Sequence, residues 1–176
     1  MPLAVWVLGH GHGGFRPGRW RIVRLEPHYG FSGLDPELVA AAEVETSRLL
    51  RDVPVAMDWL NCTPPGICSE PERPSELTVR IVEKAMPSAT RSALSMAAWS
   101  GKEGGAFIFY DRAMALRTHS RPLMHILGRV MAHEIMHLLL PEDEHTDMGL
   151  MRGLWYVDDF RFDSQACSQL ACAAAK

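Results

Sequence analysis

The sequence lacks any hydrophobic run long enough to cross a membrane. Apolar runs such as Leu138-Leu139-Leu140 contain only a few residues, whereas a transmembrane helix needs about 20. An excess of basic residues is also absent, because 18 Lys and Arg face 21 Asp and Glu and give a net charge of -3. We therefore expect no membrane span and no nucleic-acid binding driven by overall charge.

The rest of the composition is that of an ordinary folded protein. The chain has 176 residues, of which 22% are charged and 47% are apolar, so one globular domain is expected and global disorder is excluded. Residues 9–18 hold five glycines and a proline, which favours a flexible N-terminal arm over residues 1–19. Residues 20–176 should form a single domain, and we expect a monomer.

Cysteine is scarce, and its spacing excludes a zinc ribbon. The C-x5-C and C-x4-C pairs lack the C-x2-C spacing of such a site. Two short disulfides in a secreted or periplasmic protein are one interpretation, and four free thiols in a cytoplasmic protein are the other. The N-terminal apolar stretch is short and follows no basic residue, so it is a poor signal peptide. The local pairs are Cys62 with Cys68, and Cys167 with Cys172.

Hydrophobic periodicity predicts an α/β (α+β) fold. Helical spacing predicts a helix over 36–51 that follows Asp35 as N-cap. A second helix is expected over about 121–140, between Ser120 as N-cap and Pro141, which ends it. Alternating apolar residues predict strands in five segments, at residues 20–25, 53–60, 77–82, 93–99 and 106–110.

The second helix contains an HExxH motif, His133-Glu134-Ile135-Met136-His137. Residues four apart lie one above the other on a helix, so both imidazoles can bind one Zn²⁺. Glu134 lies beside them and can take a proton from a zinc-bound water. The alternative interpretation is a helix with two surface histidines and no metal.

A catalytic zinc with an open position needs a third protein ligand. A glutamate from a later helix is excluded, because no Glu follows Glu144. Pro141 ends the helix, so the residues after it can fold back toward the metal. The candidates there are His145 and Asp143, and the spacing alone leaves both open.

The motif, a following histidine and a methionine in a tight turn together resemble the metzincin clan of zinc metallopeptidases. The similarity is greatest to short bacterial proteins that read HExxHLLL, four residues, His, and then G-[IL]-M-R. Here the matching residues continue through His145 to Gly149-Leu150-Met151-Arg152. The pattern of the short bacterial proteins favours His145 as the third ligand, whereas the usual metzincin ligand stands six residues after the second histidine, where this chain has Asp143. One departure is Leu140, which stands where the metzincin motif usually has glycine.

The resemblance also implies a fold and further roles. It implies a twisted mixed sheet with an antiparallel edge strand, a backing helix and an active-site helix, followed by a small C-terminal part with a Met-turn at about 148–152. Met151 would lie beneath the metal, and a substrate would lie along an edge strand at roughly Gly104 to Tyr110. Tyr156 is a candidate hydrogen-bond donor to an oxyanion. Gly128 is expected to permit close packing of the active-site helix against the sheet.

These patterns together predict a zinc-dependent metalloendopeptidase that acts on a peptide or protein substrate. One catalytic Zn²⁺ would be held by His133, His137 and His145, with Glu134 as the catalytic base. Two alternatives are a degenerate peptidase or scaffold that binds zinc without catalysis, and a non-metal interaction domain stabilised by disulfides.

Overall fold

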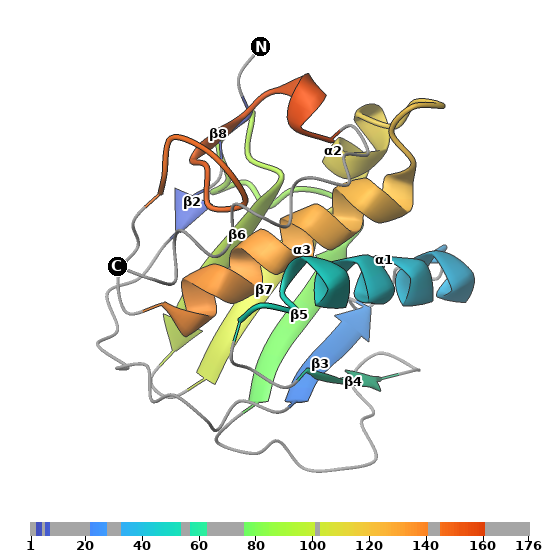
Figure 1. Ribbon diagram of the computed structural model, residues 1–176, viewed down its shortest axis with the longest axis vertical. Coiled ribbons are helices and arrows are strands. Elements are labelled where there is room, and N and C mark those ends of the chain that lie inside the picture. The colour runs from blue at the N-terminus through green and yellow to red at the C-terminus, as the bar shows by residue number, and fades with distance from the viewer. Residues whose placement is uncertain are drawn as a thin grey trace.

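The chain forms a six-stranded mixed sheet with helices across one face and a small two-stranded sheet beside it (Figure 1). The computed structural model describes residues 3–4, 6–7, 22–27, 33–53, 57–62, 76–100, 103–140 and 145–160. The strands are β1 (Leu3–Ala4), β2 (Trp6–Val7), β3 (Ile22–Pro27), β4 (Asp58–Asn61), β5 (Glu76–Val82), β6 (Ser95–Ser100), β7 (Glu103–Phe109) and β8 (Leu154–Trp155). The helices are α1 (Pro36–Leu49), α2 (Tyr110–Ala115), α3 (Leu123–Leu139) and the 3-10 helix η1 (Val157–Phe160).

The large sheet has the strand order β2-β6-β7-β5-β3-β4. All neighbouring strands run parallel except β6 and β7, which pair antiparallel with Ser95 opposite Ile108. The predicted mixed sheet is therefore present, with one antiparallel pairing, between β6 and β7.

The strand expected at the edge, Gly104 to Tyr110, was wrongly placed. It corresponds to β7, which lies inside the sheet between β6 and β5, and Tyr110 already begins α2. The physical reason lies in Gly104: a Cβ there would come within 3.1 Å of the Trp99 side chain on β6. The glycine makes room for a neighbouring strand and does not mark an exposed one.

Helices α1 and α3 cross the same face of the sheet side by side (Figure 1). The start of α1 confirms the predicted cap, because the Asp35 side chain accepts a hydrogen bond of 2.9 Å from the Glu37 N–H. The predicted Ser120 cap of α3 is wrong. Pro122 is the N-cap and makes no side-chain cap bond, since Ser120 lies in a turn closed by backbone bonds between Thr118 and Arg121.

The close contact between α1 and α3 centres on Gly128. A Cβ at this position would lie 2.7 Å from Cβ and Cγ of Glu45 and 2.9 Å from the Ala42 carbonyl oxygen. Thr46 Oγ1 bridges the helices by donating to the carbonyl oxygens of Ala42 at 2.8 Å and Gly128 at 3.1 Å. Gly128 therefore permits close packing, but against α1 and not against the sheet as predicted.

The first residues of the chain add to both sheets. Leu3–Ala4 pairs antiparallel with β8, and Trp6–Val7 pairs parallel with β6. These four residues are strands and not part of a flexible arm, because backbone pairing at a sheet edge holds them. The rest of the predicted arm lies outside the described residues. None of the described helices is long and apolar enough to cross a membrane.

The cysteine predictions stay predictions. Cys62 is 1% exposed at the end of β4. The other members of the two predicted pairs lie outside the described residues, and they are Cys68, Cys167 and Cys172.

The Gly128 contact can be tested by a Gly128→Ala substitution. Alanine stabilises a helix interior by about 1 kcal/mol relative to glycine. We nevertheless expect a net destabilisation of about 1–3 kcal/mol, because the new methyl group would push α1 away from α3. Urea unfolding measures the change. Gly105→Ala is the matched control, since a Cβ there meets Arg80 only at 3.5 Å; a stabilised Gly128→Ala protein would contradict the packing.

Candidate metal centre

Helix α3 places three ionisable side chains of the HExxH motif in the interior. His133 and Glu134 are 0% exposed, and His137 is 2% exposed. The two imidazole rings stand one helical turn apart, with centroids 4.5 Å apart in an edge-to-face arrangement. Because 14 of the 17 residues of α3 are buried, the interpretation of this segment as a helix with surface histidines is wrong.

The chain leaves α3 at Leu140, whose amide donates to the Met136 carbonyl at 2.8 Å. Leu140 has an extended backbone with φ -84° and ψ 140°. A residue with a side chain adopts this conformation freely, so the exit does not need the glycine that the metzincin pattern has. Asp143, the alternative third ligand, lies outside the described residues.

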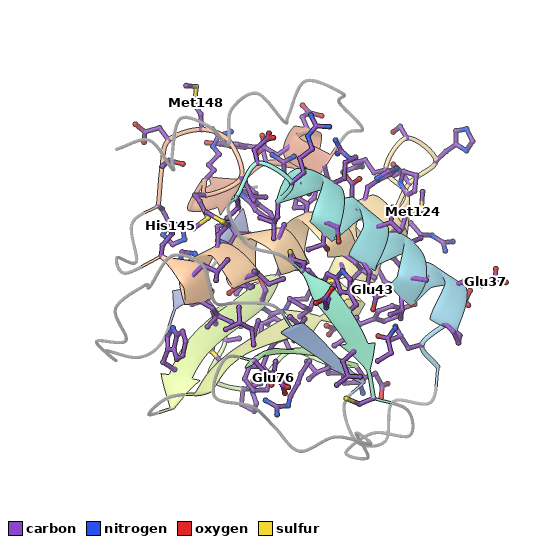
Figure 2. The ribbon with its side chains drawn as sticks, turned by 60° about the horizontal axis from the view of Figure 1, so that its bottom comes forward. Glu37, Glu43, Glu76, Met124, His145 and Met148 are labelled. Atoms are coloured by element: carbon purple, nitrogen blue, oxygen red, sulfur yellow. The ribbon has the colours of Figure 1, made fainter. Side chains whose placement is uncertain are left out.

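His145, which follows α3 in the chain, lies close to the two histidines on that helix. Figure 2 shows His145 beside the end of α3. Its Nε2 lies 3.1 Å from Nε2 of His137, which in turn lies 2.8 Å from Nε2 of His133. The three ligand atoms all lie within 4.8 Å of one another.

A short turn after His145 fixes its position. The Thr146 amide donates to the Met151 carbonyl at 2.8 Å, and Gly149 supplies the one positive φ, 81°, among the described residues. The predicted Met-turn falls in this segment, and Met151 is 2% exposed. Gly153 stands two residues after Met151, and a Cβ there would lie 2.9 Å from Cβ and Cγ of His145. The glycine thus leaves the space that His145 occupies.

The same turn sets the tautomer of His133. Its Nδ1 lies 2.6 Å from the Leu150 carbonyl oxygen, so Nδ1 must carry the proton and donate it. Nε2 of His133 then presents a lone pair toward His137 and His145. A cation among the three Nε2 atoms would satisfy such lone pairs together.

The spacing of the nitrogens suits a metal ion. Two ligands of one tetrahedral zinc, each bonded at about 2.0–2.1 Å, lie about 3.3 Å apart. The Nε2–Nε2 distance of 3.1 Å between His137 and His145 is near this value, and that of 2.8 Å between His133 and His137 is shorter, so the two helical rings would have to separate slightly around an ion. The residues present therefore fit a metal ion bound by three imidazoles.

Burial also favours the neutral form of the two imidazoles on the helix, His133 and His137. Loss of hydration, followed by repulsion from the nearby His145, lowers the pKa of His137 to about 3. Burial, followed by repulsion from His137, holds the pKa of His133 well below its usual range. Neutral imidazole is the form that binds metal, so the site is ready for a cation at neutral pH.

Glu134 is anchored from the sheet. Ser95, the first residue of β6, donates a hydrogen bond of 2.7 Å from Oγ to Oε1 of Glu134. The base candidate therefore lies beside the imidazoles with one oxygen held by a residue 39 positions earlier in the chain.

Two aromatic residues follow the turn. Trp155, which the sequence did not single out, is fully buried and meets the His133 ring edge-to-face at 4.8 Å. No spacing rule could have found it, because the contact depends on β8. Tyr156 is 48% exposed, with the Arg152 guanidinium 4.7 Å from its ring centre; its role as an oxyanion donor stays a prediction.

Comparison with known proteins places the fold. No protein-family model matches the chain, and no curated protein is similar to it in sequence. Its structure is similar to the crystal structure of metalloproteinase-II from Bacteroides fragilis, with a TM-score of 0.53 and 13% identity. The match covers 97% of this chain and 57% of that protein, so this chain spans little more than half of its length. The fold is metalloproteinase-like, and three of its histidines can hold a metal ion.

A Gly153→Ala substitution tests the placement of His145. The added methyl group would displace the His145 ring, so we expect metal affinity to fall about 10–100-fold, as for residues that orient metal ligands. Competition with a chelator of known affinity measures it, and circular dichroism checks folding. The Gly105→Ala variant serves as the control. Unchanged affinity in Gly153→Ala would show that His145 does not bind the metal.

The lowered pKa values predict how acid affects the metal-free protein. Below pH 6.5 the unfolded chain protonates its histidines, whereas folded His137 stays neutral down to about pH 3. The unfolded state therefore binds more protons, and the free energy of unfolding should fall as pH decreases from about 6.5 toward 3. We expect a loss on the order of 4 kcal/mol across this window. Urea unfolding after chelator treatment measures the free energy of unfolding at each pH. The His137→Gln variant should show a weaker dependence of this free energy on pH. An equally steep curve would contradict the lowered pKa of His137.

Proposed function

We propose that this chain is a zinc-dependent metalloendopeptidase of metzincin type. The observation that carries the proposal is the convergence of three histidine Nε2 atoms within 4.8 Å of one another, next to the buried Glu134. The similarity to a bacterial metalloproteinase fold supports the same activity.

The donor set favours zinc over the other common ions. All three candidate ligands are imidazoles, which suit Zn²⁺, whereas Mg²⁺ and Ca²⁺ prefer oxygen ligands. His133, His137 and His145 would hold the ion and leave a fourth position open, as in catalytic sites. His145 is exposed while the other two are buried, so the open position would face solvent. When bound, zinc supplies Lewis-acid chemistry: it polarises the scissile carbonyl and makes a water molecule more acidic.

Glu134 would transfer the proton that the hydrolysis requires. Glu134 takes a proton from the attacking water and passes it to the leaving amine as the peptide bond breaks. The Leu150 carbonyl keeps the proton of His133 on Nδ1, which leaves Nε2 free for the ion. Met151 is buried in the turn that follows His145, and the metzincin resemblance would place it beneath the ion.

A Glu134→Gln substitution tests the proposal. It keeps the shape of the side chain and removes its ability to accept a proton, so cleavage of quenched fluorescent peptides should fall by about 10²–10⁴-fold. Zinc content, measured by mass spectrometry of purified protein, should stay near one ion per chain. Glu83→Gln, at an exposed position on a loop, is the matched control.

Three other outcomes separate the alternatives. Protein that binds zinc but cleaves no peptide would be a scaffold. Protein that takes up no zinc from metal-replete buffer would be a non-metal interaction domain. A Glu134→Gln variant with full activity would show that Glu134 is not the catalytic base.

A further inference from the structure

Ser95 is a polar residue in an otherwise apolar stretch of the core. It is 0% exposed, and its neighbours in sequence, Leu94 and Met96, are buried apolar residues. A hydroxyl in such a place destabilises the fold by about 1–3 kcal/mol unless it finds a hydrogen-bond partner. The partner that it meets is Oε1 of Glu134, at 2.7 Å.

A comparison with Thr46 shows why this bond differs from an ordinary buried contact. The Thr46 hydroxyl, also fully buried, donates to two backbone carbonyl oxygens and joins α1 to α3. The Ser95 hydroxyl instead donates to the side chain of the candidate base. Side chain to side chain bonds are only about 10–15% of protein hydrogen bonds, so the choice of partner is specific.

The bond has a geometric consequence for Glu134. The helix fixes the backbone of Glu134, but the last torsion of a glutamate side chain is broad and about two-fold. A donor on one oxygen selects one orientation of the carboxylate plane. Because Ser95 pairs with Ile108 inside the sheet, the donor itself is held by β6 and β7. The carboxylate is therefore oriented by the sheet, and not by its own helix alone.

We infer that Ser95 is a positioning residue, whose hydroxyl holds the Glu134 carboxylate in the orientation that proton transfer requires. This inference rests on the proposed peptidase function and deepens it. Ser95 touches neither the metal nor the reacting atoms, so it acts through Glu134.

The test compares a substitution that removes the hydroxyl donor with one that keeps it. Ser95→Ala removes the donor, and Ser95→Thr keeps it with one added methyl group. On a fluorescent peptide, Ser95→Ala should lower kcat by about 10–100-fold, the range typical of residues that orient a catalytic site. KM should stay within about two-fold, since substrate binding is not changed. Ser95→Thr should recover most of kcat. Thr46→Val, which also loses a buried hydroxyl, is the matched control and should lower stability without lowering kcat.

A second measurement does not depend on turnover. A peptide hydroxamate binds zinc and donates a hydrogen bond to a neighbouring carboxylate, so its affinity for the zinc-loaded protein reports the position of Glu134. Calorimetry should show about ten-fold weaker binding to Ser95→Ala and near-normal binding to Ser95→Thr.

The outcomes distinguish the two proposals. Normal kcat and hydroxamate affinity in Ser95→Ala would overturn the role of Ser95. The role of Ser95 would also be overturned if the loss of kcat in Ser95→Ala were explained by a lower zinc content or a smaller folded fraction. It would be overturned as well if Thr46→Val lost as much kcat as Ser95→Ala. A wild-type protein without activity would overturn the peptidase function instead, and an active Glu134→Gln variant would overturn the role of Glu134 as the base. In both cases the hydroxamate measurement would still decide whether Ser95 positions the carboxylate.

Discussion

Helix α3 buries three ionisable side chains, and the surrounding structure has to satisfy each of them. A polar group removed from water destabilises the protein unless it finds a partner. Two segments supply partners: β6 provides Ser95 for Glu134, and the turn provides the Leu150 carbonyl for His133. His145 brings its Nε2 to 3.1 Å from Nε2 of His137. The three converging Nε2 atoms remain, and a cation is the group that would satisfy them together. The arrangement of the sheet, the helix and the turn is therefore tied to one polar centre inside an apolar core.

The position of α3 depends equally on a contact far from that centre. Gly128 lies on the half of α3 that precedes the motif, against Ala42 and Glu45 of α1. Glu45 is held there by Arg48, through two hydrogen bonds of 2.7 Å, and by His125 at 3.5 Å. Burial raises the pKa of Glu45, but its hydrogen bonds and attraction to Arg48 outweigh this and lower the pKa overall. Glu45 therefore stays ionised and paired at the contact between α1 and α3.

The features that could be predicted from the sequence are those that depend on residues close together in the chain. The i, i+4 histidines, the Asp35 cap and the helix end before Pro141 are short-range patterns, and the structure has them. The sequence could not predict contacts that only the topology creates. The resemblance implied an edge strand at roughly Gly104 to Tyr110, although β7 lies between β6 and β5. Ser95 and Glu134 are 39 residues apart, and no periodicity connects them. The resemblance to the short bacterial proteins supplied His145, since spacing alone left Asp143 as an equal candidate.

The uneven burial of the three histidines follows from how each is supported, and it bears on what the site can do. His133 and His137 come from a helix enclosed on nearly all sides, and Trp155 closes the space beside the His133 ring. His145 comes from a turn, with Gly153 as the neighbour that leaves it room. A site closed on every side would suit a structural metal, which fills all four positions with protein ligands. Two buried histidines with a third at the surface would instead leave one direction open toward solvent if they held an ion. The proposed hydrolysis would use that direction for the substrate, with the Glu134 carboxylate that Ser95 holds as its base.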